Sequence, residues 1–257
     1  MSNSMHYRTI VMSDVHIGSE WSKIKEATQF LKKYTCDTLI LCGDIIDGWS
    51  LLRGRNKWKK RHTKFIRLLL KIQYNTQIIY LRGNHDDFLD EVLPIQFQNI
   101  HIVKDFVYRS ARKSYYVTHG DIFDMVTSRF RWLAKIGDIG YTWLMWINKR
   151  YNVWRAKRGL PYYSLSHQVK NKVKSAVSYI SEFEKQLTEI ARKKGCDGII
   201  CGHIHHPENR YYDEIHYLNA GDWVESLSAL VEDYKGNWNV VYSEVKTPKQ
   251  FIEDVSQ

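Results

Sequence analysis

The chain has 257 residues, enough for one large domain or two small ones with a full hydrophobic core. Hydrophobic residues make up 44% of it and charged residues 26%, which is typical of a globular protein, and its net charge at pH 7 is +10. We expect neither a membrane span nor a signal peptide, because the first nine residues are polar and the longest apolar run near a helix, residues 139–147, is too short to cross a bilayer.

Strand and helix patterns alternate along the first half of the chain. Strands are predicted at residues 8–13, 38–42 and 77–81, amphipathic helices at 23–33 and 62–73, and short β segments at 100–103, 107–109 and 115–118. A long helix is predicted at about 168–194, followed by strands at 198–201, 215–218, 227–231 and 239–242. Strand–helix units followed by β-rich segments are typical of a layered α/β sandwich.

The positive charge is concentrated in one segment. Residues 125–176 contain eleven lysines and arginines and a single acid, Asp138, so this segment accounts for the whole net charge. Such a concentration indicates a polyanion or an anionic membrane surface as partner, although a merely solvated basic face is the alternative. We therefore predict a core formed by residues 1–124 and 177–257, with residues 125–176 as a basic, tryptophan-rich helical insertion.

Polar side chains directly follow five of the predicted strands. The five segments are Ser13-Asp14-Val15-His16, Gly43-Asp44-Ile45-Ile46-Asp47, Gly83-Asn84-His85-Asp86, Thr118-His119-Gly120-Asp121 and Gly202-His203-Ile204-His205. Loops at the carboxyl ends of strands converge on one crevice in α/β folds, so these groups are expected to meet. Any one of them alone is more often a surface or hydrogen-bonded pair, but the five together predict a metal site.

The donor set also indicates the kind of metal. Oxygens of Asp14, Asp44 and Asn84 combine with the imidazoles of His16, His119, His203 and His205, a mixture that suits manganese, iron or zinc. The four cysteines show no paired spacing. We expect them to be reduced thiols of a cytoplasmic protein rather than zinc ligands.

The motif series DVH, GDIID, GNHD, THGD and GHIH resembles the calcineurin-like metallophosphoesterase family. The resemblance implies a four-layer α/β/β/α sandwich, here with a helical insertion, and hydrolysis of phosphoesters or diphosphates by two divalent metal ions. Manganese is expected, with iron or zinc as alternatives. By the same resemblance, Asp14, His16 and His205 would bind one ion, Asn84, His119 and His203 the other, and Asp44 both.

The resemblance also implies how the leaving group receives its proton. His85 would be the general acid and Asp47 the carboxylate that orients it, with a purely hydrogen-bonding His85 as the alternative. Arg82 is a candidate phosphate ligand, although a salt bridge would explain it equally well. Asp121 and Asp222 are expected to brace metal-ligand histidines.

Within the family, the chain most resembles the UDP-2,3-diacylglucosamine diphosphatase group of lipid A biosynthesis. The blocks GDIIDGW, GNHDDFL and NAGDWVES carry this resemblance, together with the insertion. Two features depart from that group: His85 stands where its members have arginine, and a basic stretch containing Arg53 and Arg55 replaces an acidic, aromatic one. The chain therefore resembles a sister branch, whose implied substrate is a lipid-linked nucleotide.

The insertion carries tryptophans at near-helical spacing, among them Trp143, with interleaved cations such as Arg150. Such a segment suits a lid over an acylated diphosphate, or docking on anionic lipid, so we expect a peripheral protein on the inner face of the cytoplasmic membrane. Packing of these aromatics onto the core is the alternative. Arg53, Arg55, Arg82, Trp143 and Arg150 are the predicted substrate-binding residues.

Two other functions remain open at this point. The first is a phosphodiesterase or nuclease, which the basic segment would serve, although its aromatics lack the pattern of a stacking platform and nucleic acid is not the expected partner. The second is a non-enzymatic adaptor at a membrane surface that keeps a relic fold. All seven donor positions are filled, which favours an enzyme. The sequence does not predict an oligomeric state.

Overall fold

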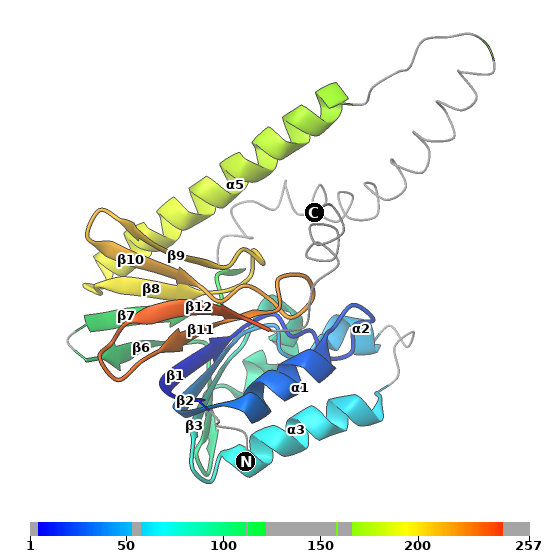
Figure 1. Ribbon diagram of the computed structural model, residues 1–257, viewed down its shortest axis with the longest axis vertical. Coiled ribbons are helices and arrows are strands. Elements are labelled where there is room, and N and C mark those ends of the chain that lie inside the picture. Colours follow the sequence, from blue (N-terminus) through cyan, green and yellow to red (C-terminus); the bar gives the residue numbers. More distant parts are fainter. Residues whose placement is uncertain (1–4, 53–57, 112, 122–157, 159–165, 244–257) are drawn as a thin grey trace. The chain divides into compact units, whose positions relative to one another are not determined.

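The computed structural model describes residues 5–52, 58–111, 113–121, 158 and 166–243 (Figure 1). By its internal contacts the chain divides into two units, Met1–Asp121 with Gln186–Gln257, and Ile122–Lys185. Of the predicted insertion, the structure describes only residues 158 and 166–176, so its boundaries stay a prediction. Among the helices that are described, none is both long enough and apolar enough to cross a membrane.

The larger sheet has seven strands in the order β12-β11-β1-β2-β3-β5-β4. They are β1 (Met5–Met12), β2 (Tyr34–Cys42), β3 (Gln77–Leu81), β4 (Ile95–Phe97), β5 (Ile100–Val103), β11 (Ser228–Glu232) and β12 (Trp238–Tyr242). Strands β1, β2, β3 and β5 are parallel, whereas β4, β11 and β12 join antiparallel. The parallel centre directs the ends of β1, β2 and β3 to one edge of the sheet.

The smaller sheet has five strands in the order β6-β7-β8-β10-β9. They are β6 (Asp105–Ser110), β7 (Lys113–Thr118), β8 (Gly198–Cys201), β9 (Glu208–Tyr212) and β10 (Ile215–Asn219). Strands β7, β8 and β10 are parallel, with β6 and β9 antiparallel at the two edges. The two motif-bearing strands of this sheet, β7 and β8, are therefore neighbours.

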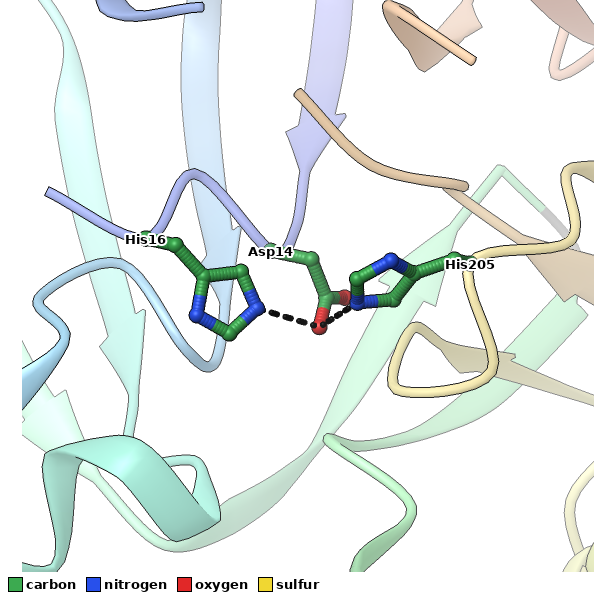
Figure 2. Close-up of side chains that lie close together, drawn as sticks. All are labelled: Asp14, His16 and His205. Carbon is green, nitrogen blue, oxygen red and sulfur yellow. Dashed lines mark hydrogen bonds and ion pairs between the residues drawn. The ribbon is translucent and has the colours of Figure 1, made fainter. Parts of the chain in front are cut away.

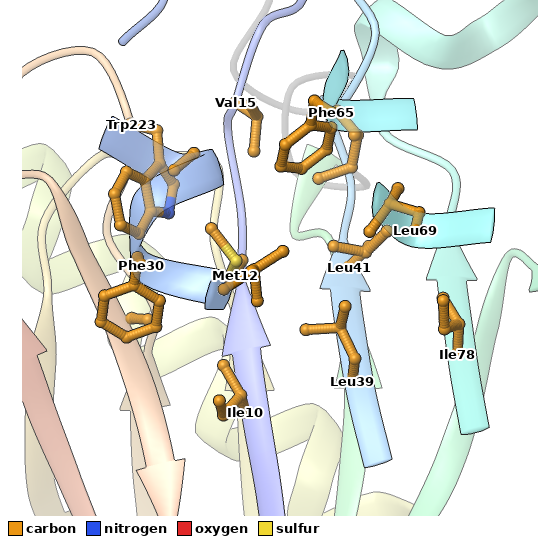
Figure 3. Packing of buried hydrophobic residues seen from close by; sticks show 14 of the residues in the cluster. Ile10, Met12, Val15, Phe30, Leu39, Leu41, Phe65, Leu69, Ile78 and Trp223 are labelled. Carbon is orange, nitrogen blue, oxygen red and sulfur yellow. The ribbon is translucent and has the colours of Figure 1, made fainter. Parts of the chain in front are cut away.

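Alternation along the central strands explains the layers. Ile10, Met12, Leu39 and Leu41 point to one face, where they pack against residues such as Phe30 and Phe65 (Figure 3). Val11, Ile40 and Cys42 alternate with them and pack with Val117, Ile200 and Leu218 of the smaller sheet. Because both faces are buried, these strands are continuous apolar runs in the sequence, which made them predictable.

Helices flank both sheets. Helices α1 (Ile24–Lys33) and α3 (Lys60–Ile72) cover the outer face of the larger sheet (Figure 1). At the end of α5 (Ser166–Lys193), Leu187 and Ala191 are buried, and the Nζ atom of Lys194 lies 4.5 Å from the ring centroid of Tyr116 in β7. The predicted four-layer α/β/β/α fold is confirmed.

Four short elements are not among those predicted. They are α2 (Gly48–Leu52), the 3₁₀ helix η1 (Asn84–Val92) and the strands β4 and β9. Each directly follows or adjoins a turn and is too short to show a period, and all three residues of β4 are exposed. Helix α2 and η1 contact each other, and they begin at the second and third predicted motifs.

Candidate metal centre

The five predicted motifs follow β1, β2, β3, β7 and β8, and the structure brings their side chains together at one edge of the two sheets. Two of the resulting groups, Asp14 with His16 and His205, and Asp44 with His119 and His203, each have one donor atom per residue within 4.8 Å of the others. His16, Asp47 and His85 form a third such group. Side chains up to 191 residues apart in the sequence therefore share one site.

The first group is centred on the fully buried Asp14. Its Oδ1 atom lies 3.1 Å from Nε2 of His205 and 3.6 Å from Nε2 of His16 (Figure 2). Its Oδ2 atom accepts hydrogen bonds from the Ser13 hydroxyl at 2.6 Å and from the backbone N–H of His203 at 2.9 Å. One carboxylate oxygen is thus held by the protein, while the other faces two imidazoles.

Asp44 belongs to the second group and also faces the first. Its Oδ2 atom is 3.8 Å from Nε2 of His16 and 3.4 Å from Nε2 of His119. Its Oδ1 atom accepts the backbone N–H of His85 at 2.8 Å, which fixes the carboxylate. A carboxylate that faces ligands of both groups has the position needed to be shared by two cations.

Buried atoms without partners test whether a metal fits this site. Nε2 of His119 and Oδ1 of Asn84 are both buried and have no hydrogen bond to any residue that the structure describes. Nδ1 of His119 lies 2.9 Å from the carbonyl oxygen of Cys42, so donation there leaves the Nε2 lone pair free. An unsatisfied buried polar atom costs about 1–3 kcal/mol, and a cation would remove this cost. The donors fit a divalent transition metal.

The electrostatics of the site also favour cations. Burial by itself raises the pKa of Asp14 and Asp44, but the neighbouring histidines outweigh it, so both carboxyl groups have lowered pKa values. Burial disfavours charged histidines here, yet Asp44 raises the pKa of His119 to about 10, and Asp14 raises that of His205 to about 9. Without metal ions, protons therefore take up part of the negative field.

The backbone at the site is strained. Five donor residues adopt left-handed φ angles, namely Asp14 (52°), His16 (49°), Asp44 (53°), His203 (71°) and His205 (54°). This conformation costs non-glycine residues on the order of 1–3 kcal/mol each, and it persists only where the surroundings impose it. Strain of this kind concentrates at functional sites, because there the direction in which a side chain points matters more than the stability of the local backbone.

Close packing explains two glycines of the motifs. A Cβ atom on Gly43, whose φ is 84°, would lie 2.3 Å from Nδ1 of His119. A Cβ atom on Gly83 would lie 2.2 Å from Oδ1 of Asp44. Both loops therefore approach donor side chains more closely than any residue with a side chain allows.

His85 lies beside the two donor groups. Its Nδ1 atom is 3.0 Å from Oδ1 of Asp47, and its Nε2 atom is 3.9 Å from Oδ2 of Asp44. Burial raises the pKa of Asp47, but hydrogen bonds from His85 and Ser50 outweigh this and lower it to about 2. For His85 burial acts in the opposite direction and lowers the pKa, but Asp47 and Asp44 outweigh this and raise it. The pair is therefore an anionic carboxylate and an imidazole that readily holds a proton.

Comparison of the sequence with protein families shows which family the protein belongs to. Residues 7–207 match the model of the calcineurin-like phosphoesterase family. The chain belongs to this family. It is therefore a hydrolase that acts on phosphoesters, and its family depends on two metal ions. The enzyme class predicted from the motifs is confirmed, while the identity of the metals is not determined.

Three similar solved structures have low sequence identity to this phosphoesterase. An archaeal phosphodiesterase is 16% identical over 91% of this chain and 98% of its own (TM-score 0.43). Yfce, a phosphoesterase from E. coli, is 14% identical over 92% and 99% (TM-score 0.42), and Vps29 from Chaetomium thermophilum is 10% identical over 95% and 100% (TM-score 0.43). No curated protein sequence matches the chain.

Arg82 of this phosphoesterase is held by two carboxylates. Asp90 accepts hydrogen bonds from its Nε and Nη2 atoms at 2.7 and 2.8 Å, and Asp121 accepts one from Nη1. Asp121 thus binds Arg82 and makes no hydrogen bond to a histidine among the described residues. Three of the five guanidinium N–H groups are engaged in this way, and contact between Arg82 and substrate stays a prediction.

Asp222 was predicted to brace a metal-ligand histidine. Asp222 has its Oδ1 atom 3.9 Å from Nδ1 of His205, and the same oxygen accepts the backbone N–H of Val224 at 2.7 Å. Asp222 thus holds a turn and faces one donor histidine. Arg53, Arg55, Trp143 and Arg150 lie outside the described residues, so their substrate contacts stay predictions.

Two residues of the motifs proved to contact the site without having been given a role. The ring of Trp49 lies over that of His85, with centroids 4.3 Å apart, and its Nε1–H donates to Asp87 at 3.1 Å. The Ser13 hydroxyl reaches both Asp14 and the carbonyl oxygen of Cys42, at 2.6 and 2.7 Å. Both residues are close in the sequence to predicted site residues, which was the only sign of their role. Closeness in the sequence does not show which loops contact each other.

Asp86 connects two of the motif loops, which predicts a large effect on stability. Its buried carboxylate accepts hydrogen bonds from the backbone N–H groups of Ile45 and Ile46 and from the Tyr80 hydroxyl. In an Asp86→Ala variant these donors lose their acceptor inside the protein. We expect the free energy of unfolding to fall by about 3 kcal/mol or more.

Urea denaturation of the purified proteins measures this difference. Glu91→Ala removes an exposed carboxylate from the same 3₁₀ helix and serves as the matched control. We expect the control to stay within about 0.5 kcal/mol of the unmodified protein. Equal stability of the two variants would contradict the role given to Asp86.

Proposed function

We propose that this phosphoesterase uses two divalent metal ions to hydrolyse the diphosphate bond of a lipid-linked nucleotide such as UDP-2,3-diacylglucosamine, releasing UMP and the lipid 1-phosphate. The observation that carries the reaction is the Asp44 carboxylate, which faces His16 on one side and His119 on the other, next to His85. The motif blocks shared with the diphosphatase group support the choice of substrate.

The donor groups support the following assignment of ligands. Asp14, His16 and His205 would hold one ion, Asn84, His119 and His203 would hold the other, and Asp44 would serve both, with manganese as the expected metal. When bound, the ions stabilise negative charge on the phosphoryl oxygens and lower the pKa of water, so that a nucleophile forms at neutral pH. The raised pKa values of His119 and His205 mean that binding displaces protons from these residues.

The residues of the chain supply the proton for the leaving group. His85 donates it from Nε2 to the oxygen that departs from phosphorus, because Nδ1 is engaged by Asp47. Asp47 stays anionic and holds the imidazole in position, and the Ser50 hydroxyl and backbone N–H in turn hold Asp47 at 2.5 and 2.8 Å. Trp49 covers one face of the His85 ring and limits its rotation. The proton donor is thus positioned before substrate binds.

The basic insertion supports a location beside the substrate's membrane. Its eleven cations and interleaved tryptophans suit contact with anionic headgroups and with an acyl chain, so the protein would be peripheral on the inner face of the cytoplasmic membrane. We propose that Arg53, Arg55, Trp143 and Arg150 contact the substrate. Arg82 would join them through the guanidinium N–H groups that Asp90 and Asp121 leave unused.

One assay separates the substrate from the chemistry. Manganese-loaded protein is incubated with UDP-2,3-diacylglucosamine, with bis-p-nitrophenyl phosphate and with single-stranded DNA, and UMP, p-nitrophenol and shortened DNA are measured. We expect UMP release from the first. If only bis-p-nitrophenyl phosphate is cleaved, the lipid-linked substrate is wrong while the metal chemistry stands. Preferred cleavage of DNA would establish the alternative, a nuclease, and no cleavage with no bound metal would favour the adaptor.

A further inference from the structure

A second concentration of positive charge lies within the core, apart from the insertion. Residues 48–85 contain ten lysines and arginines and no aspartate or glutamate. Helix α3 lies in the middle of this span and has no acidic residue in its first turn. A stretch of this length without acids leaves its cations with few local partners, so their placement on the helix decides what they can bind.

Four of these cations form one stripe along α3. Lys60, Lys64, Arg67 and Lys71 are exposed and spaced at i, i+4, i+7 and i+11. At 100° per residue they lie within roughly 60° of one another around the axis and extend over about 16 Å. Among the described residues, none of the four forms an ion pair or a hydrogen bond through its side chain. The stripe is therefore a line of uncompensated charge.

The stripe faces away from the core. His62, Phe65 and Leu69 are the buried residues of α3, and they lie on the opposite side of the helix. Figure 1 shows α3 as the cyan helix on the outer side of the larger sheet, next to α1. The charged side thus has no protein layer over it among the residues that the structure describes.

Aromatic and aliphatic side chains border the stripe. Trp58, Leu70 and Tyr74 are 46%, 47% and 71% exposed. Trp58 precedes the helix and is fixed to it, because its Nε1–H donates to the Thr63 hydroxyl at 2.8 Å. Tyr74 follows the other end of the helix. Tryptophan and tyrosine at the two ends of a row of cations match the headgroup region of a bilayer, where amphipathic rings and cations both find partners.

Nucleic acid would also satisfy the charge, but it fits the arrangement less well. Single strands bind where successive aromatic rings offer stacking surfaces along a groove. Here the exposed rings stand near the two ends of a convex helix, Trp58 against its first turn and Tyr74 beyond its last. A straight line of cations with an anchor at each end is suited to a flat anionic surface.

We propose that the α3 basic face, formed by Lys60, Lys64, Arg67 and Lys71 with Trp58, Leu70 and Tyr74, docks onto an anionic phospholipid bilayer. This contact surface is separate from the insertion and belongs to the core. Docking would hold the enzyme close to a lipid-linked substrate, and this consequence rests on the proposed function. The docking itself rests only on the charge and exposure of α3.

The test compares two variants with the same change in charge. One replaces Lys60, Lys64, Arg67 and Lys71 with glutamine, and the control replaces four exposed cations elsewhere, Lys104, Arg109, Lys193 and Lys235. Binding to vesicles of phosphatidylcholine with phosphatidylglycerol is measured by sedimentation at low and high salt. Each cation near such a surface contributes roughly fivefold, so the α3 variant, which lacks four, should bind roughly six-hundredfold more weakly. We expect the control to bind nearly as the unmodified protein does, and all binding to weaken with salt.

Hydrolysis of bis-p-nitrophenyl phosphate by the same variants separates docking from catalysis. Weaker vesicle binding with unchanged hydrolysis supports the proposal, even if UDP-2,3-diacylglucosamine proves not to be a substrate. Unchanged vesicle binding by the α3 variant, or an equal loss in the control, overturns it. A stronger affinity of the unmodified protein for single-stranded DNA than for vesicles, lost in the α3 variant, also overturns it and makes the α3 basic face a nucleic-acid surface.

Discussion

Replacing Asp44 with asparagine is expected to lower kcat by about a thousandfold or more. The Oδ2 atom of Asp44 faces His16 of one donor group and His119 of the other. Loss of its charge therefore weakens both proposed metal sites at once. Asparagine keeps the size of the side chain beside Gly83 and can still accept the backbone N–H of His85, so the effect reports charge and not shape.

Metal content per chain and steady-state kinetics with bis-p-nitrophenyl phosphate measure this effect together. We expect Asp44→Asn to retain fewer metal ions than the unmodified protein after gel filtration. Asp105→Asn, the same change at an exposed position, is the control and should keep both metal ions and activity. Two bound ions and a normal kcat in Asp44→Asn would show that this carboxylate is not shared.

The second large effect is expected at His85, and its size should depend on the leaving group. A leaving oxygen of high pKa needs a proton in the transition state, and a positioned general acid contributes about 10²–10⁴-fold. p-Nitrophenolate departs without one. His85→Ala should therefore slow hydrolysis of an alkyl phosphodiester by about that factor and slow release of p-nitrophenol much less. Equal losses on both substrates would assign His85 to hydrogen bonding alone.

The pH profile of an Asp47→Asn variant tests how His85 is tuned. Asp47 is anionic above its pKa of about 2, and it raises the pKa of His85 against the effect of burial. The active form of a general acid is protonated, so the rate is present below the His85 pKa and is lost as pH rises through it. Asparagine removes the stabilising charge, and the alkaline limb of kcat should move to lower pH. An unmoved limb would mean that another group sets it.

Much of the fold could be predicted because burial leaves a clear record in the sequence. Strands β1, β2 and β3 are buried on both faces and appear as apolar runs, and α3 shows Phe65 and Leu69 at helical spacing. The short elements α2 and η1 left no such record. They nevertheless matter for the site, since the rings of Trp49 in α2 and His85 in η1 contact each other.

The sequence by itself predicted the candidate donor side chains and the family, because each motif places polar residues directly after a strand and parallel strands end at a common edge. Only the tertiary structure decided how those residues pair. It put Asp44 between His16 and His119, tied Arg82 to Asp90 and Asp121, and exposed the cations of α3 as one stripe. Such pairings depend on left-handed turns and on loop contacts across more than a hundred residues, and no local pattern encodes them.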